Sequence, residues 1–431
     1  MASGEKVSPS RMRVCVVGAG AAGLCAARHL AADTESFEPA VFEQTNTVGG
    51  TWVYNEKTGV DEFGYPIHSS MYYNLRTNLP GKIMNFPDFS RLGEMEHGYV
   101  THQQVLQYLR NYADHFQLHR LIQLNVRVEN IKPKVSSDLA ESSKWNVRIK
   151  NLKTQNIEER EFDAVLICNG HFFEPNIPSI PGIETFPGTF LHSHSYRKPE
   201  VYSGKTVIIL GASSSGTDIA IELHSHAYKV YLSHHNARIT SVLPSNIIQV
   251  DAIERISVNQ FFLKDGTSVS ADTFIFCTGY KYKFPFLDES CGIQVDDNYV
   301  SPLYKHLINI AHPTMCLVGI PFVVIPFPMF HMQVQFFLNL LKERFQLPPK
   351  ADMLEDAKLK IPLKRHAHKL ANNQWDYNNN LADMGGFKRL PKFYRIGYMA
   401  SHSQRLTNLL NYKKSEFILS EDGESVQIIN H

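Results

Sequence analysis

The 431-residue sequence lacks the features that mark several large classes of protein. Its 43 lysines and arginines are balanced by 42 aspartates and glutamates, so the net charge is +1 and no basic surface for nucleic acid is indicated. The most apolar stretch, residues 315–330, contains three prolines and is too short to cross a bilayer. The first thirteen residues are polar and lead directly into an apolar run, so neither a signal peptide nor a membrane anchor is predicted.

Cysteine is scarce, and its placement excludes two further classes of site. The six cysteines include no Cys-x-x-Cys pair, which argues against a dithiol redox centre and a zinc ribbon. Cys15, Cys168 and Cys277 lie in or at the end of apolar runs, where cysteine behaves as a small hydrophobic residue. We therefore predict a reduced, cytoplasmic protein. The sequence leaves its oligomeric state open, a homo-oligomer included.

Metal ligands with a recognisable spacing are also missing. The twenty histidines include three His-x-His pairs, at residues 192–194, 224–226 and 366–368. None of these pairs is accompanied by further ligands at the spacing of a metal site. The sequence therefore predicts no metal.

One plan is present twice along the chain. The first copy has an apolar strand at 14–17, a glycine-rich turn at 18–23, a helix at 24–32, a strand at 40–42 and a buried strand at 162–168. The second copy repeats this order with a strand at 207–210, a turn at 211–216, a helix at 217–223, a strand at 229–232 and a buried strand at 274–277. Alternation of this kind predicts an α/β protein with two Rossmann-like dinucleotide-binding domains built on parallel sheets.

Chain order predicts that the second domain is inserted into the first. A further apolar strand at 315–319 follows the second copy and is expected to return to the first sheet. The division is therefore a first segment of the larger domain at 1–198, the inserted domain at 199–295, and a second segment with a helical C-terminal region at 296–431.

The first turn has the spacing of a pyrophosphate-binding loop. Gly18, Gly20 and Gly23 follow a predicted strand and open a helix, so they satisfy a tight turn, a close approach of the backbone to phosphate, and helix–strand packing. Glu43 comes twenty residues after Gly23, at the position of an acidic ligand to ribose. The sequence predicts a dinucleotide here.

A second glycine pair follows shortly afterwards. Gly49 and Gly50 would let the backbone lie close to a large planar ligand, with Thr51 and Trp52 beside it. On its own this segment fits an ordinary loop equally well.

The second turn replaces the middle glycine by serine. Gly211 and Gly216 keep the tight turn and the helix packing, and the hydroxyls of Ser213, Ser214 and Ser215 can donate hydrogen bonds to phosphate.

The residues after the next strand bear on which nicotinamide cofactor is used. Ser233 ends that strand and Arg238 follows a little later, although no arginine comes directly after the strand. A cation near the ribose phosphate favours NADPH over NADH. How strictly NADH is excluded stays open.

Taken together, these motifs resemble the flavin-containing monooxygenases. The linker at 186–196 has the family sequence Phe-x-Gly-x-x-x-His-x-x-x-Tyr, with His192 and Tyr196 in its second half. The Gly-Gly-x-Trp run at 49–52 and the Cys-Thr-Gly-Tyr run at 277–280 are further family features. The resemblance extends from about residue 12 to beyond residue 333.

The resemblance implies the cofactors and the chemistry. FAD would occupy the first turn and NADPH the second. Hydride transfer from NADPH to FAD would be followed by addition of O2 as a C4a-hydroperoxyflavin, which oxygenates a soft nucleophile such as an amine nitrogen or a sulfide sulfur. Such chemistry needs a site that excludes water and contains no strong base, which agrees with the absence of a catalytic acid–base pair.

The resemblance also implies two residues close to the flavin. Asn78 lies in a segment similar to the one that carries the family's active-site asparagine, although an asparagine before Leu-Pro would by itself be read as a turn residue. Gln333 lies in a segment similar to the one that brings a glutamine to the flavin.

More narrowly, the chain resembles insect members of the family, which include oxygenases that convert plant pyrrolizidine alkaloids to N-oxides. It departs from vertebrate members, which carry a large insertion and a hydrophobic C-terminal anchor.

Three alternatives share part of the pattern. A Baeyer–Villiger monooxygenase has both turns but differs at the position of Tyr196. A pyridine nucleotide–disulfide reductase needs a cysteine pair that is absent. The third alternative is a non-catalytic dinucleotide-binding protein, and the intact glycines of both turns together with the intact linker motif argue against it.

Overall fold

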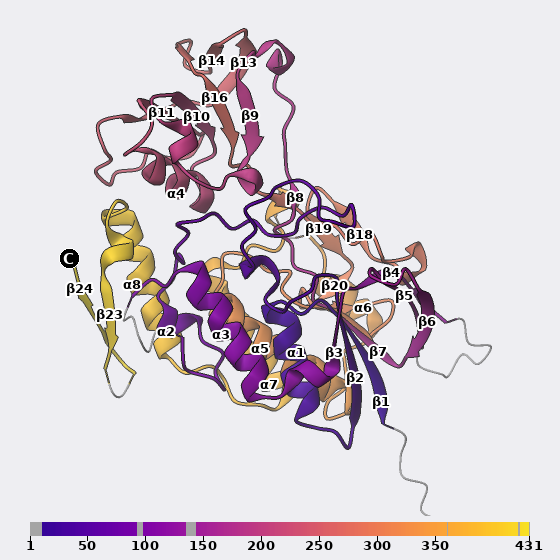
Figure 1. Ribbon diagram of the computed structural model, residues 1–431. Coiled ribbons are helices and arrows are strands. Elements are labelled where there is room, and N and C mark those ends of the chain that lie inside the picture. The colour runs from indigo at the N-terminus through magenta and orange to yellow at the C-terminus, as the bar shows by residue number, and fades with distance from the viewer. Residues whose placement is uncertain (1–10, 93–97, 135–143, 360, 421–422, 431) are drawn as a thin grey trace, which may run out of the picture.

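The computed structural model describes residues 11–92, 98–134, 144–359, 361–420 and 423–430. The polar segment expected at 1–10 lies outside these residues. Figure 1 shows a larger lobe, with a smaller lobe that contains β9–β16 and α4 placed above it. The predicted two-domain α/β architecture is confirmed.

The larger lobe is built on a seven-stranded sheet. In spatial order its strands are β20 (Leu303–Tyr304), β21 (Ile308–Asn309), β22 (Met315–Leu317), β7 (Ala164–Ile167), β1 (Met12–Val17), β2 (Phe37–Glu43) and β3 (Ile122–Leu124). The strands from β22 to β3 pair in parallel, whereas β20 and β21 are antiparallel to their neighbours. Since β22 pairs with β7, the chain does return to the first sheet after the second domain.

Alternation along β1 determines which layer covers each face of this sheet. Val14 and Val16 pack in one core with α1, α3 and α5, whereas Cys15 and Val17 pack in another core with the meander β4–β6. The α-helices described for this lobe before the C-terminal region are α1 (Ala21–Ala31), α2 (Gly81–Met84), α3 (His102–His115), α5 (Pro326–Leu341), α6 (Lys350–Asp356) and α7 (Gln374–Gly385). The meander consists of β4 (Val126–Pro133), β5 (Trp145–Asn151) and β6 (Ile157–Phe162).

The smaller lobe repeats this arrangement around a five-stranded parallel sheet. Its strands are β12 (Ile247–Val250), β11 (Lys229–Ser233), β10 (Thr206–Leu210), β16 (Thr273–Phe276) and β9 (Thr189–His192). Val207 and Ile209 face the core beneath α4 (Ser214–Leu223), and Ile208 faces the opposite core. A second meander lies on that side, formed by β13 (Ile253–Ser257), β14 (Gln260–Leu263) and β15 (Ser268–Ser270).

Short strands connect the two lobes. β8 (Glu174–Pro175) pairs with β17 (Tyr280–Lys281), and β18 (Gln294–Asp296) forms a hairpin with β19 (Tyr299–Ser301). The linker strand β9 lies before residue 199 and yet pairs with β16 in the second sheet. The smaller sheet thus begins upstream of the expected boundary, and the division near residues 199 and 296 stays a prediction.

The C-terminal region folds back against the smaller lobe. It contains α8 (Phe393–Thr407) and a hairpin of β23 (Glu416–Leu419) with β24 (Val426–Ile429). In Figure 1 this yellow segment lies beside α4, and Arg405 on α8 donates hydrogen bonds to Ser214 and Thr217.

Two sequence predictions are answered by the structure directly. All six cysteines are buried and unpaired, which includes Cys15, Cys168 and Cys277, for which burial was predicted. Within the described ranges, every helix is too short or too polar to cross a bilayer.

Candidate active site

The first glycine turn is sterically closed to any side chain at two positions. Gly18 has φ +96°, in the left-handed region that favours glycine. A Cβ atom at Gly23 would lie 1.8 Å from the carbonyl oxygen of Gly18, so α1 packs directly on the turn. These contacts place the N-terminus of α1 at the carboxyl end of β1, the usual location of a bound pyrophosphate.

The N-terminus of α1 is open to an anion. Among the described residues no side chain caps it, and its first turn contains no acidic residue. The N–H groups of a first helical turn lack partners within the helix, and the helix dipole favours negative charge there. Gly20 lies against Gly50, because a Cβ on Gly50 would come within 2.9 Å of the Gly20 Cα. The bare backbone on both sides fits the diphosphate of FAD.

Glu43 holds the turn and keeps capacity for a ribose. Its Oε2 accepts a hydrogen bond from the Ala19 N–H at 2.8 Å, and its Oε1 accepts two from the N–H and hydroxyl of Thr45, each at 2.8 Å. A carboxylate can accept about four hydrogen bonds, so a ribose hydroxyl can still donate to it. The predicted position of Glu43 at the end of β2 is confirmed.

The second turn reproduces the first. Gly211 has φ +106°, and a Cβ at Gly216 would lie 1.7 Å from the Gly211 carbonyl oxygen. The neighbouring strand also matches, because a Cβ at Gly18 or Gly211 would meet the carbonyl oxygen of Cys168 or Cys277 respectively. The two turns therefore offer the same kind of phosphate site in the two domains.

The predicted serines lie at the start of α4. Ser213 is the N-cap residue, but among the described residues no side chain caps this helix end either. Ser214 and Ser215 are the first two helical residues, so their backbone N–H groups are available to a phosphate.

Arg405 is a candidate site residue that the sequence did not reveal. Its guanidinium donates to the Ser214 hydroxyl at 3.1 Å and to the Thr217 hydroxyl at 3.3 Å. A cation beside a helix N-terminus opposes the helix dipole, whereas an anion bound between them would be stabilised by both. No local pattern could have revealed it, because Arg405 lies 191 positions along the chain from Ser214.

Ser233 and Arg238, the two candidates for contact with the ribose phosphate of NADPH, differ in whether their side chains can reach a ligand. Ser233 ends β11, is fully buried, and donates its hydroxyl hydrogen bond to the Asp251 carbonyl oxygen at 2.8 Å. Arg238 is exposed and donates to the Gln249 carbonyl oxygen at 2.6 Å. Arg238 is therefore the better placed of the two for a ribose phosphate.

The segment from Gly49 to Trp52 lies against the first turn through Gly50 and Gly20, and its predicted approach to a planar ligand stays a prediction. Gly50, Thr51 and Trp52 form a short 3-10 helix, η1 (Gly50–Trp52). The Thr51 hydroxyl lies 3.2 Å from that of Ser70, and the Trp52 ring packs edge-on against Phe327.

Asn78, the predicted active-site asparagine, is held through its amide oxygen. Its side chain is exposed, and its Oδ1 accepts a hydrogen bond from the Tyr412 hydroxyl at 3.2 Å. Among the described residues no acceptor is assigned to its Nδ2. Because Tyr412 occupies the oxygen, the amide group is oriented with its N–H donors directed away from that contact.

Polar contacts tie the Asn78 segment to α4. The Lys413 ammonium donates to the Asp218 carboxylate at 2.6 Å and to the Arg76 carbonyl oxygen at 2.9 Å. The Tyr72 hydroxyl also donates to Asp218. Burial lowers the pKa of Lys413, which Asp218 partly offsets. These contacts hold α4, the helix that follows the second turn, against the loop that carries Asn78.

A second carboxylate on α4 joins the linker to the same segment. Glu222 accepts hydrogen bonds from Asn74 at 2.7 Å and from the Tyr196 hydroxyl at 2.9 Å. Burial raises the pKa of Glu222 to about 7, against these two donors, which lower it.

The linker residues His192 and Tyr196 have structural partners. His192 ends β9, accepts a hydrogen bond from the His194 N–H at 3.1 Å, and packs edge-on against Tyr280. Burial lowers the pKa of His192 to about 4, so its ring is neutral at pH 7. Tyr196 is fully buried in the core of the smaller lobe. These positions favour a role in fixing the linker, and direct contact with a cofactor stays a prediction.

Gln333 is also enclosed by protein. Its Oε1 accepts from the Gly319 N–H at 2.9 Å, and its Nε2 donates to the Tyr377 hydroxyl at 2.7 Å. Because both ends of the amide are occupied and the side chain is fully buried, Gln333 is better placed to hold the loop after β22 than to touch the flavin. Its predicted contact with the flavin remains untested.

Comparison with known proteins agrees with this geometry. The family model described as flavin-binding monooxygenase-like matches residues 11–243 and 239–389. The flavin-containing monooxygenase FMO GS-OX4 of Arabidopsis thaliana is 36% identical, with 92% of this chain and 89% of that protein covered. FMO GS-OX-like 4 from the same plant is 34% identical, with 94% and 95% covered.

Solved structures give the same result. S-allyl-L-cysteine S-oxygenase from Allium sativum has a TM-score of 0.86 and 32% identity, with 95% of this chain and 96% of that chain covered. Tmm from Pelagibacter sp. strain HTCC7211 has a TM-score of 0.83 and 26% identity, with 97% and 96% covered. Cyclohexanone monooxygenase shares the fold, with a TM-score of 0.61 at 14% identity. The organisms named are plants and a Pelagibacter strain, and one of the proteins is an S-oxygenase, so the narrower resemblance to insect alkaloid oxygenases receives no support from them. The chain belongs to the flavin-binding monooxygenase-like family, whose enzymes use FAD and NADPH.

Proposed function

We propose that this enzyme uses NADPH and O2 to transfer one oxygen atom to a soft nucleophilic atom of a small molecule. The observation that carries the proposal is the pairing of two equivalent phosphate turns with an asparagine loop tied to the second of them. Bound FAD, once reduced by NADPH, supplies the activated oxygen.

Asn78 is the residue proposed to orient that oxygen. Its Nδ2 can donate a hydrogen bond, but a neutral amide cannot remove a proton, so the activated oxygen is not discharged prematurely. Tyr412 holds the amide in place through Oδ1. The contacts of Lys413 and Tyr72 with Asp218 fix the loop relative to α4, where the second cofactor would bind.

Sulfide sulfur is the acceptor that the relatives support best. An S-oxygenase covers nearly the whole chain at a TM-score of 0.86, which favours a thioether as substrate. The sequence resemblance to insect members supports a tertiary amine of the pyrrolizidine alkaloid class as the second acceptor. Both are soft nucleophiles, so one mechanism accommodates either. Six buried, unpaired cysteines support a reducing compartment, and hence the cytoplasmic location proposed from the sequence.

The test measures product formed for each NADPH consumed. FAD-loaded enzyme is supplied with a thioether, a tertiary amine and a cyclic ketone in turn. We expect a sulfoxide or an N-oxide, and no ester from the ketone. Asn78→Leu should keep FAD and accept hydride but release hydrogen peroxide, with oxygen transfer reduced about 10²–10³-fold, or about 2.7–4 kcal/mol.

Asn111→Leu serves as the matched control. Asn111 is an exposed asparagine on α3 whose Oδ1 accepts from Gln107. Its replacement should leave coupling unchanged. Wild-type coupling in Asn78→Leu would remove Asn78 from the mechanism, and an ester as the main product would identify a Baeyer–Villiger enzyme instead.

A further inference from the structure

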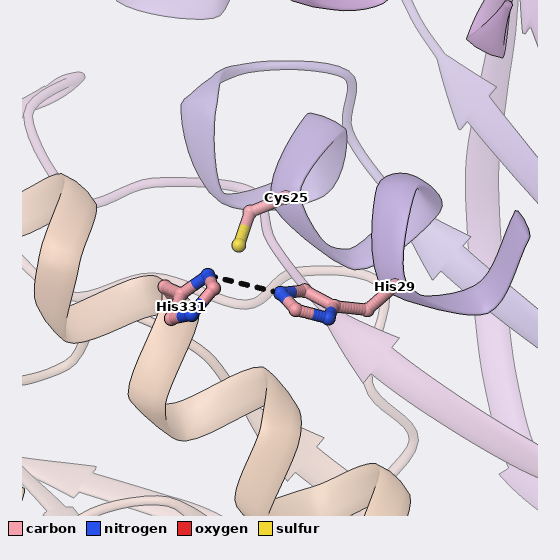
Figure 2. A group of neighbouring side chains, drawn as sticks. All are labelled: Cys25, His29 and His331. Atoms are coloured by element: carbon pink, nitrogen blue, oxygen red, sulfur yellow. Dashed lines mark hydrogen bonds between the residues drawn. The ribbon is translucent and has the colours of Figure 1, made fainter. Parts of the chain in front are cut away.

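Three potential metal ligands from two helices meet in the larger lobe. None of them belongs to a His-x-His pair, and the sequence predicted no metal. Cys25 and His29 are four residues apart on α1 and therefore lie on one face of that helix. His331 on α5 points toward them from the opposite side (Figure 2). The Cys25 Sγ and one ring nitrogen from each histidine all lie within 4.8 Å of one another.

The spacing of the two nitrogen atoms fits a tetrahedral ion. His29 Nε2 and His331 Nδ1 are 3.0 Å apart. Zinc–nitrogen bonds of about 2.0–2.1 Å place two tetrahedral ligands about 3.3 Å apart, so only a small separation of the rings would admit an ion. We propose that Cys25, His29 and His331 form a zinc site that joins α1 to α5.

A fourth donor lies next to this group. The Oδ1 of Asp88 is 3.8 Å from the same His331 nitrogen. Both Asp88 oxygens are buried and have no hydrogen-bond partner among the described residues. The Asp88 Oδ2 forms an ion pair with the Arg28 Nε at 3.2 Å. A thiolate and a carboxylate would neutralise the two charges of Zn²⁺. Asp88 is therefore the residue that completes the coordination, shared with Arg28 on its other oxygen.

The donor set at this site suits a divalent cation that accepts both nitrogen and sulfur ligands. Each neutral imidazole offers one nitrogen lone pair, and the hydrogen bond between His29 Nε2 and His331 Nδ1 would be exchanged for two zinc–nitrogen bonds. Zinc binding would release the thiol proton to solvent and form the thiolate–zinc bond. Thiolate with imidazole selects zinc over magnesium or calcium.

The site lies between two helices that frame the FAD domain. The side chains of His331 and Asp88 are 12% and 20% exposed, so the group lies close beneath the surface. α1 opens at the first glycine turn, and α5 carries Gln333 two residues after His331. An ion between the helices would thus stabilise the framework of the FAD domain without touching either cofactor turn.

The test uses FAD-loaded enzyme treated with a chelator and then titrated with Zn²⁺ alone. We expect one zinc per chain by elemental analysis, a higher unfolding temperature, and proton release in calorimetry repeated in two buffers of different ionisation enthalpy. Co²⁺ in place of Zn²⁺ should give a thiolate charge-transfer absorption in the near ultraviolet, which requires no variant. Cys25→Ser and His331→Gln should each weaken zinc binding at least about 100-fold, and Asp88→Asn about 10–100-fold.

Cys316→Ser is the matched control, since Cys316 is an equally buried thiol on β22 outside the group. It should leave zinc binding unchanged. Absence of stoichiometric zinc in the wild type, absence of the charge-transfer band, or equal binding by wild type and Cys25→Ser would each overturn the proposal. Monooxygenase activity is not needed for any of these readouts.

Discussion

A pair of alanine substitutions separates the two cofactor sites. Gly23→Ala and Gly216→Ala place the same methyl group at equivalent positions of the two domains. The new Cβ would lie 1.8 Å from the Gly18 carbonyl oxygen in one domain and 1.7 Å from the Gly211 carbonyl oxygen in the other. Ordinary contacts of a Cβ begin at 3.4 Å, so each turn must open by about 1.6 Å. Because the obstructing atoms belong to backbone, no side-chain rotation relieves the contact.

The magnitude follows from two opposing effects. Alanine is a better helix former than glycine by about 1 kcal/mol. Overpacking of this kind costs about 1–3 kcal/mol. The net cost is therefore about 0–2 kcal/mol, and contacts as short as these with backbone belong at the upper end of that range, about 2 kcal/mol. In the free protein the turn can open and relieve the contact. Cofactor binding requires the closed turn, so the steric cost appears as weaker binding, and the affinity for the cofactor should fall about 30-fold.

The assay follows the two cofactors separately. Gly23→Ala should lose FAD on dilution and rebind it about 30-fold more weakly. Gly216→Ala should retain FAD but require about 30-fold more NADPH for half-maximal flavin reduction in stopped-flow measurements. Each variant is the control for the other. Loss of FAD from Gly216→Ala with retention in Gly23→Ala would refute the assignment of the turns, and unchanged affinities in both would refute the steric reasoning.

Three further changes test the contacts around these turns. Arg405→Ala removes a charged donor at the Ser214 end of α4 and should raise the NADPH concentration for half-maximal flavin reduction about tenfold, with FAD affinity unchanged; an unchanged value would confine Arg405 to packing. Tyr412→Phe removes the hydrogen bond to Asn78 and should slow oxygen transfer about fivefold while flavin reduction keeps its rate; equal slowing of both steps would contradict a positioning role. Glu222, with a pKa raised from 4.5 to about 7, binds a proton in the folded protein that the unfolded chain releases, so folding stability falls as pH rises through this range. Glu222→Gln should therefore gain about 1–3 kcal/mol relative to wild type between pH 5 and pH 8 in thermal unfolding, and a pH-independent difference would contradict the raised pKa.

Much of the fold could be predicted because its signals are local. The strand at 14–17 lies within β1, and the helix expected at 217–223 lies within α4, which begins three residues earlier, at Ser214. The turns between them follow from glycine spacing alone, since only backbone without a Cβ fits against Gly18 or Gly211.

The remainder depends on contacts between distant segments. β9 has no sequence signal for the sheet it joins, because any short apolar strand could pair at that edge. The contacts of Tyr412 with Asn78 and of Arg405 with α4 require the C-terminal region to fold back, which no local pattern shows. In the same way, His331 lies 302 positions from His29, so their encounter could not be seen from spacing.

The most direct test of the account is isotopic. FAD-loaded enzyme is supplied with NADPH, a thioether and ¹⁸O₂, and the oxygenated product is analysed by mass spectrometry. The account predicts one ¹⁸O atom in the sulfoxide for each NADPH oxidised, with the second oxygen atom in water. Unlabelled product, or consumption of NADPH that yields only hydrogen peroxide with both sulfide and amine, would contradict it.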